Sequence, residues 1–145
     1  MKKCFPFCAA LLAVLLALGS CAGTPPGAPA QPPAAYADPD ALLRLIREKT
    51  EPFYVVDVRS REEYGRGHIP TAINVPVDQI SRKPPTPNKS TLIVVYCASG
   101  ARSAKAKQAL EALGYARVAD FGPMSRWKGS TLTGEDPGDC PCLVQ

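Results

Sequence analysis

The chain alternates segments that resemble buried strands with segments that resemble helices, and this alternation limits its fold more than any other feature. Apolar runs of strand length occupy residues 53–58, 72–75, 91–96 and 116–121. Helical spacing of apolar residues is found over residues 39–49 and 102–113, with one helical turn over 62–64. Such alternation in units of roughly 20–30 residues predicts an α/β domain with a parallel sheet.

The first twenty residues have the features of an export signal. Two lysines precede an apolar run, residues 5–18, that is too short for a comfortable membrane span. The run ends in Leu18-Gly19-Ser20-Cys21, which resembles the lipobox of bacterial lipoproteins, where the cysteine becomes the lipidated first residue. We expect residues 1–20 to be a lipoprotein signal peptide and Cys21 to anchor the protein in a membrane of the bacterial cell envelope, facing the periplasm. The alternative is an ordinary secretory signal cleaved slightly later.

Composition divides the rest of the chain into three parts. Residues 21–37 are rich in proline and alanine, so we expect a semi-extended tether after the anchor. Residues 38–138 are long enough for one small domain, and residues 139–145 form a tail. Without the signal, the formal charge falls from +4 to +2, because 15 basic residues face 13 acidic ones. So small a surplus, with no basic-aromatic stripe, argues against a nucleic-acid partner.

Cys97 follows one predicted strand directly, and parallel sheets bind ligands at the carboxyl ends of their strands. The small residues Ala98, Ser99, Gly100 and Ala101 precede Arg102 and a helix, so free amide groups can point at the sulfur. Ionising most of a thiol whose usual pKa is about 8.5 at neutral pH requires roughly 2.7 kcal/mol. A helix dipole contributes only about 0.3–1 kcal/mol at exposed sites. Several amide hydrogen bonds, helped by Arg102, are therefore needed.

Two motifs in this order resemble the rhodanese family of sulfurtransferases. Residues 97–103 (CASGARS) resemble its active-site loop, and residues 55–59 (VVDVR), 63–64 (EY) and 67–76 (GHIPTAINVP) resemble its first signature. The resemblance implies a three-layer domain with a five-stranded parallel sheet between helices. It also implies ping-pong transfer of sulfane sulfur from a donor such as thiosulfate to cyanide or a thiol, through a persulfide on Cys97. The amides of residues 98–102 would hold the persulfide and Arg102 would dock an anionic donor; no cofactor or metal is expected.

Other uses of the same loop are open. Cysteine phosphatases and arsenate reductases place five residues between cysteine and arginine, whereas four separate Cys97 from Arg102. The tighter loop favours a donor that offers one sulfur atom. A rhodanese-like domain that binds a partner, or senses sulfane sulfur or oxidants without sustained turnover, is the main alternative. A buried structural cysteine is a further one.

Four more residues match the family pattern, and we expect them to support the site structurally. Asp57 and Arg59 form its Asp-x-Arg, and His68 is the only histidine in the chain. Trp127 matches a late tryptophan, although Gly122-Pro123 stands where paired glycines are usual. Position 98 is alanine where many relatives carry arginine, which predicts weaker thiosulfate affinity.

The tail contains Cys140 and Cys142, separated only by a proline. One interpretation is a small-ring disulfide or two exposed thiols. The other is a redox or sulfur-accepting pair that reaches Cys97, since a ring this tight would be strained and easily reduced.

Overall fold

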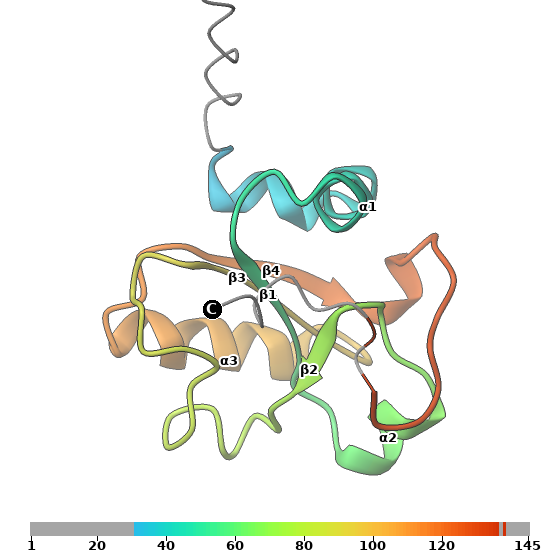
Figure 1. Cartoon of the computed structure of the whole chain (residues 1–145). Helices are drawn as coiled ribbons and strands as arrows, with labels where there is room; N and C mark the ends of the chain where they lie inside the picture. Colours follow the sequence, from blue (N-terminus) through green and yellow to red (C-terminus); the bar gives the residue numbers. More distant parts are fainter. Residues whose placement is uncertain (1–30, 137, 139–145) are drawn as a thin grey trace, which may run out of the picture.

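Four parallel strands form the central sheet of the computed structural model, which describes residues 31–136 and residue 138 (Figure 1). They lie in the order β2-β1-β3-β4, with bounds β1 (Phe53–Asp57), β2 (Ala72–Asn74), β3 (Leu92–Cys97) and β4 (Val118–Pro123). Each corresponds to one of the strand-like runs predicted from the sequence. Because all four are parallel, their carboxyl ends share one edge of the sheet, and β3 ends there with Cys97.

Helices α1 (Pro39–Glu48) and α3 (Ala101–Ala112) cover opposite faces of the sheet and complete a three-layer arrangement (Figure 1). The predicted start of α1 is confirmed, because the Asp38 carboxylate accepts hydrogen bonds from the amides of Asp40 and Ala41. The end of α3 is also as predicted. Gly114 adopts a φ of 86°, a left-handed conformation that favours glycine after a helix.

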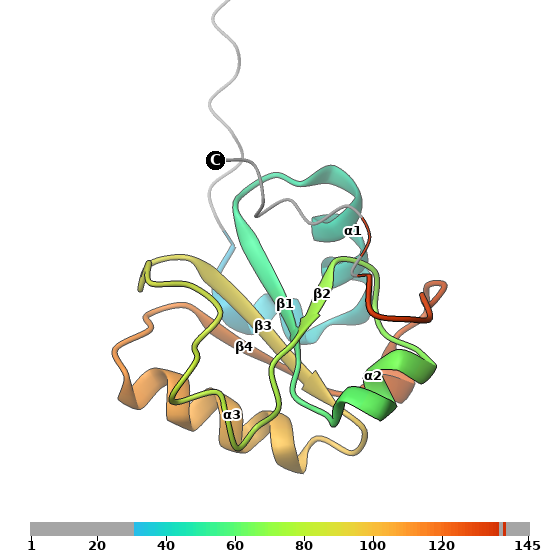
Figure 2. The same ribbon diagram turned by 60° about the horizontal axis from the view of Figure 1, so that its bottom comes forward.

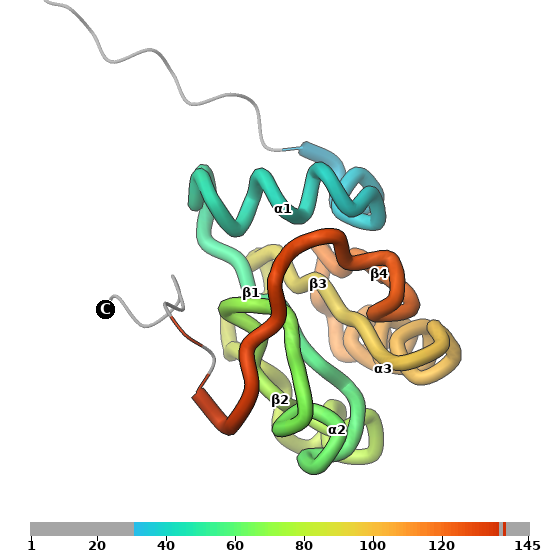
Figure 3. Tube along the Cα trace, turned by 90° about the vertical axis from the view of Figure 1, so that its right-hand side faces the viewer, coloured from blue at the N-terminus to red at the C-terminus, as the bar shows by residue number. Residues whose placement is uncertain are grey.

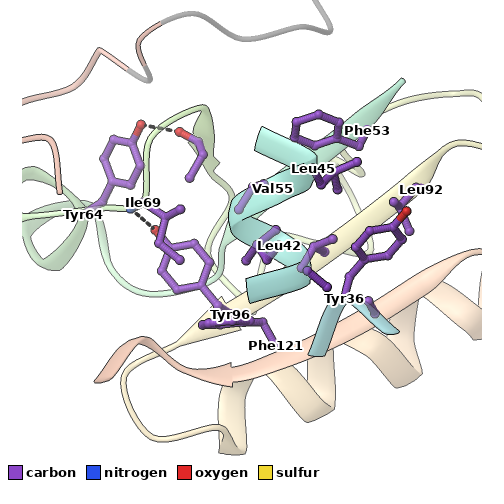
Figure 4. Close-up of a cluster of buried hydrophobic side chains, with 14 residues drawn as sticks. Tyr36, Leu42, Leu45, Phe53, Val55, Tyr64, Ile69, Leu92, Tyr96 and Phe121 are labelled. Carbon is purple, nitrogen blue, oxygen red and sulfur yellow. Dashed lines mark hydrogen bonds between the residues drawn. The ribbon is translucent and has the colours of Figure 1, made fainter. Parts of the chain in front are cut away.

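Alternate residues of the central strands face opposite layers. Phe53 and Val55 of β1 lie in one apolar cluster with Leu42 and Leu45 of α1 (Figure 4). Val56 belongs to a second cluster on the other face, which includes residues of α3. Burial on both faces explains why the strand sequences are almost continuously apolar.

The expectation of five strands, which came from the family resemblance, is wrong for the described residues, which contain four. The described residues before α1, 31–38, do not extend the sheet. They include a 3-10 helix, η1 (Pro33–Ala37), which packs over β3 and β4 in the layer of α1 (Figure 1). Pro32 and Pro33 lack amide hydrogens and cannot donate to a strand ladder. Tyr36, assigned to the tether by composition, lies in the core at 4% exposure.

The described chain enters the domain at the edge formed by the amino ends of the strands. Arg117, just before β4, donates to the Gln31 carbonyl at 3.3 Å and forms an ion pair with Glu51, just before β1. The Tyr36 hydroxyl donates to Glu51 at 2.8 Å. Burial, together with this carboxylate, raises the pKa of Tyr36 to about 12. Gln31 and Cys97 therefore lie at opposite edges of the sheet.

Helix α2 (Arg61–Arg66) follows β1 and is longer than the single turn predicted. The Ser60 hydroxyl accepts a hydrogen bond from the Glu63 amide at 3.3 Å, and the Glu63 carboxylate accepts one from the Ser60 amide at 3.0 Å. This reciprocal capping box starts the helix early, and the helix continues through Gly65 to end before Gly67.

After η2 (Met124–Arg126) the chain returns along α2, as the red segment in Figure 3 shows. His68 and Leu132 exchange two backbone hydrogen bonds of 2.9 Å, and the Gly134 amide donates to the Gly65 carbonyl at 2.9 Å. This segment holds α2 against the domain. No helix within residues 31–136 combines the length and the apolar character needed to cross a bilayer.

Candidate active site

Cys97 ends β3, and the loop after it leads into α3 at the edge of the sheet where α2 lies (Figure 2). The pairing of β3 with β4 shifts between Val95 and Tyr96, opposite Gly122. Gly122 has a φ of 82°, which favours glycine. Such a bulge bends and twists a strand locally and can re-aim a side chain. Gly122-Pro123, which stands where paired glycines are usual, therefore lies at the bulge between β3 and β4 next to Cys97.

Backbone amides of the loop after β3 and of the first turn of α3 act on the Cys97 sulfur. The Gly100 amide donates to Sγ at 3.0 Å. Gly100 has a φ of 97° and precedes the first residue of α3, Ala101, so the loop turns back toward the sulfur there. Ala98 and Ser99 are exposed, whereas Cys97 itself is 0% exposed. In this conformation Cys97 is closed off from solvent.

The pKa of the Cys97 thiol is lowered by its surroundings. Burial acts against ionisation and is the largest single influence. The amide and the hydroxyl of Ser103, followed by the amides of Gly100 and Ser99, together outweigh burial because they stabilise the negatively charged sulfur. The structure therefore favours a thiolate, which is the nucleophilic form of cysteine.

Ser103 is part of the site, and the sequence reasoning gave it no role. It is fully buried, and its hydroxyl lies 3.7 Å from Sγ of Cys97, where the thiol can donate to it. The same hydroxyl donates to the Gly100 carbonyl at 2.9 Å. Ser103 could have been identified from its position in the first turn of α3, where it faces inward while Arg102 faces outward.

Arg102 lies beside the site but is already paired with a carboxylate. Its two terminal nitrogens donate to the Glu63 carboxylate at 2.6 and 2.9 Å, which joins α3 to α2. The hydrogen bond from Arg102 is the main reason that the pKa of Glu63 falls to about 2. Glu63 had been noted only as part of the family signature. The partner of Arg102 in this state is thus a residue of the protein.

Asp57 and Arg59 form a buried ion pair at the carboxyl end of β1. The Arg59 Nε lies 2.9 Å and its Nη2 2.6 Å from the Asp57 carboxylate, and Nη2 also donates to the Gly67 carbonyl at 2.6 Å. Asp57 is 0% exposed. The guanidinium also lies 5.8 Å from the ring centre of Tyr96, the residue before Cys97. These contacts join the end of β1 to the Gly67 carbonyl and to Tyr96 of β3; the supporting role expected for Asp57 and Arg59 stays a prediction.

His68 supports the loop after α2. Its ring stacks on that of Tyr64 at a centroid distance of 3.8 Å. Its Nδ1 lies 3.1 Å from the Tyr64 carbonyl oxygen and its Nε2 lies 3.0 Å from the Asp136 carbonyl oxygen. Within the described residues these contacts join the ring to α2 and to the segment after η2, and none of them involves the Cys97 sulfur.

A cleft of about 370 Å³ adjoins the site. It is lined by Arg59, Glu63, Arg66, Gly67, Met124 and Thr131. Trp127 does not line it; its ring packs against the apolar cluster of Figure 4, and its indole nitrogen donates to the Ser130 carbonyl at 2.9 Å. Met124, not predicted from the sequence, supplies an apolar wall to the cleft.

Cys21, Cys140 and Cys142 lie outside the described residues. Among the residues that are described, no group of three or more His, Cys, Asp or Glu side chains is arranged to hold a metal ion.

Known proteins agree with this arrangement. Residues 38–129 match the rhodanese family model, described as a rhodanese-like domain. The chain is 36% identical over 91 residues to the putative sulfurtransferase YtwF of Bacillus subtilis, covering 63% of this chain and 88% of YtwF. It is also 36% identical over 69 residues to thiosulfate sulfurtransferase PspE of Escherichia coli, covering 46% of this chain and 66% of PspE.

A solved structure of a rhodanese with anions from E. coli has a TM-score of 0.54 and 30% identity, covering 57% of this chain and 99% of that one. The similarity to the putative sulfur carrier protein YrkF of B. subtilis, 30% identical over 101 residues, spans only 55% of YrkF. The family match extends over the whole sheet and the cysteine loop. The chain therefore belongs to the rhodanese family, with a single rhodanese-like domain that has sulfurtransferase homologues.

Proposed function

We propose that this protein moves sulfane sulfur from an anionic donor such as thiosulfate to a thiol or to cyanide, through a persulfide on Cys97. One observation carries the proposal: the sulfur of Cys97 accepts the Gly100 amide at 3.0 Å, in surroundings that lower the pKa of the thiol. The names of the putative sulfurtransferase YtwF and of thiosulfate sulfurtransferase PspE support the reaction class.

The reaction has two displacement steps. The Cys97 thiolate attacks the outer sulfur of thiosulfate; the new S–S bond forms as the bond to the sulfonate sulfur breaks, and sulfite leaves with that electron pair. An acceptor thiolate then attacks the outer sulfur of the persulfide, which releases the Cys97 thiolate and gives a persulfide of the acceptor. The amides of Ser99, Gly100 and Ser103 stabilise the anion on Cys97 before and after each step. The surroundings lower the pKa of the thiol, which reduces the need for a general base.

The test is to incubate the purified chain with thiosulfate, measure its mass and locate the added sulfur by peptide mapping. Cyanide is then added and thiocyanate is followed over time. We expect one sulfur on Cys97, its loss in Cys97→Ser, and repeated turnover with cyanide. Absence of sulfur on Cys97 after thiosulfate, mercaptopyruvate and polysulfide would rule the proposal out.

A second function is sensing of sulfane sulfur or oxidants without sustained turnover. The observation in its favour is that Cys97 is 0% exposed, so a donor or an acceptor reaches the sulfur only after the surrounding residues move. A single modification of Cys97, followed by slow release to any acceptor, would identify this function. Many thiocyanate molecules formed per protein would exclude it.

The tail offers candidate acceptors in the same chain. Cys140 or Cys142, as a thiolate, would take the outer sulfur of the Cys97 persulfide and carry it as its own persulfide. The double variant Cys140→Ser/Cys142→Ser should then turn over more slowly with thiol acceptors, while its first step is unchanged. Equal rates with and without the pair would leave it as a small-ring disulfide or two exposed thiols.

We also propose that the domain works at a membrane of the bacterial cell envelope, through a lipid on Cys21. The support is the sequence ending at Ser20-Cys21 after a short apolar run. Metabolic labelling with an alkyne fatty acid should mark the wild-type protein and not Cys21→Ser. Release of the wild-type protein, unlabelled, into the soluble periplasmic fraction would instead indicate an ordinary secretory signal.

A further inference from the structure

The Glu63 carboxylate is held in place by hydrogen bonds from two other residues. The Glu63 carboxylate accepts two hydrogen bonds from Arg102 and a third from the Ser60 amide at 3.0 Å. The side chains of this ion pair are about one third exposed, at 30% for Glu63 and 34% for Arg102. The carboxylate is therefore held in place by the capping box of α2 while it remains open to ligands and solvent.

Glu63 of this pair lines a cleft whose wall is connected to the strand residue that pairs with Cys97. Glu63 lines the cleft together with Met124, which directly follows Pro123. Pro123 is the residue of β4 that pairs with Cys97. Its ring would lie 3.6 Å from a Cβ atom placed on Gly100, so it also contacts the cysteine loop. An anion that approaches Cys97 from the cleft thus meets the charge of Glu63.

The arginines of this region are mostly neutralised by carboxylates. Arg59 is paired with Asp57, and Arg102 with Glu63. Arg66 lines the same cleft and has no ion-pair partner within residues 31–136. The two carboxylates cancel two of these three guanidinium charges, and the Cys97 thiolate adds a further negative charge at the point of attack.

We propose that Glu63 is a specificity-determining residue that weakens the binding of dianionic sulfur donors and favours donors with one negative charge. The inference rests on the proposed function and concerns the substrate class of the same site. Glu63 acts by holding Arg102 and by repelling the donor directly. Thiosulfate, a dianion at neutral pH, meets this repulsion twice as strongly as a thiosulfonate, a monoanion.

Electrostatic interaction energy is proportional to the charge of the ligand, and this gives a quantitative expectation. A unit charge about 6 Å away in surroundings like water changes the binding of a monoanion about threefold. The same charge changes the binding of a dianion by the square of that factor, about ninefold. A residue that acts only on loop structure would change both by the same factor.

The test compares Glu63→Gln with wild type, using thiosulfate and methanethiosulfonate as donors. Both give the same persulfide on Cys97, with sulfite or methanesulfinate as the leaving group. Glutamine keeps an oxygen for the Ser60 amide and removes the charge that holds Arg102. We expect KM to fall about ninefold for thiosulfate and about threefold for methanethiosulfonate, with little change in kcat. Added salt should reduce both effects.

The matched control is Glu135→Gln, which removes a carboxylate that pairs with Arg61 of the same helix. Its KM values should stay within twofold of wild type for both donors. Equal factors for the two donors in Glu63→Gln, or a change confined to kcat, would overturn the proposal.

A binding measurement separates this proposal from the proposed function. Sulfate and methanesulfonate cannot donate sulfur, but each can protect Cys97 from iodoacetamide. In Glu63→Gln, protection should improve about ninefold for sulfate and about threefold for methanesulfonate. Charge-dependent protection without any persulfide would overturn sulfur transfer and leave the charge selectivity standing. Persulfide formation with equal protection factors would overturn the charge selectivity alone.

Discussion

The hydroxyl oxygen of Ser103 lies 3.7 Å from the sulfur of Cys97 and donates a hydrogen bond to the Gly100 carbonyl at 2.9 Å. When the thiol is neutral, it donates to this hydroxyl. When the sulfur is ionised, the hydroxyl can rotate about its C–O bond and donate to the sulfur instead. Ser103 thus couples the ionisation of Cys97 to the conformation of the loop, because the same hydroxyl contacts the sulfur and the Gly100 carbonyl.

Ser103→Ala should raise the pKa of Cys97, because one group that stabilises the thiolate is lost. At neutral pH we expect alkylation of Cys97 by iodoacetamide to slow by roughly three- to tenfold. Its pH profile should shift to higher pH, while the rate at high pH returns toward that of wild type. The exposed Ser81 provides a control, and Ser81→Ala should leave the profile in place. An unshifted profile for Ser103→Ala would mean that the amides alone ionise the thiol.

Asp57→Ala should lower the free energy of unfolding by about 3–5 kcal/mol, because it leaves the buried Arg59 guanidinium without its carboxylate. Urea unfolding measures this loss. The exposed pair of Arg61 and Glu135 is the comparison, and Glu135→Ala should leave the free energy of unfolding almost unchanged. Per folded molecule, the Asp57 variant should still form the Cys97 persulfide. A stable but inactive variant would instead give Asp57 a direct part in catalysis.

Thr71→Gly should stabilise the protein by about 1 kcal/mol. Thr71 has a φ of 69°, which is unfavourable for a β-branched residue, and its hydroxyl is buried without a hydrogen-bond partner among the described residues. It occupies the third position of a turn closed by the Ala72 amide and the Ile69 carbonyl at 3.0 Å, where glycine is preferred. Thr71→Ala, which removes only the hydroxyl and branching, should gain less. A lower midpoint of urea unfolding in Thr71→Gly would show that packing of the threonine side chain outweighs its strain.

The ion pair of Glu63 predicts a loss of stability in acid. The pKa of Glu63 is lowered from 4.5 to about 2 in the folded protein, mainly by Arg102. A carboxylate with a lowered pKa contributes stability above its unfolded pKa, and this contribution disappears as pH falls toward the folded pKa. Wild type should therefore lose stability between about pH 4.5 and pH 2. Urea unfolding of Glu63→Gln across this range should show a shallower decline; parallel curves would contradict the assignment.

The secondary structure was predictable because its signals are local. The apolar runs of β1 and β3, the cap at Asp38 and the glycine at position 114 each depend on neighbours within a few residues. Cys97 could be placed at the edge of the sheet for the same reason, since a strand directly precedes it. Helix α2 was underestimated because Gly65 was given more weight than the capping box formed by Ser60 and Glu63.

The interactions that define the chemistry of the site were not predictable from local pattern. Glu63 and Arg102 are 39 positions apart in the sequence, and only the packing of α2 beside α3 brings them together. From the sequence alone, Arg102 was therefore expected to bind an anionic donor, and its pairing with Glu63 was not foreseen. Tyr36 was missed for a similar reason, because its neighbours are proline and alanine while the core it enters is formed by residues far along the chain.

The opposite positions of Gln31 and Cys97 have a practical consequence for surface-bound forms of the protein. Gln31 is held by Arg117 at the amino ends of the strands, and Cys97 ends β3 at the other side of the sheet. A resin, a sensor chip or a fusion partner joined ahead of residue 31 would meet the domain on the side away from its sulfur. Protein captured in this way should accept sulfur from solution as readily as the free protein. A support-bound reagent for sulfane sulfur could therefore be made from this domain without changing the residues around Cys97.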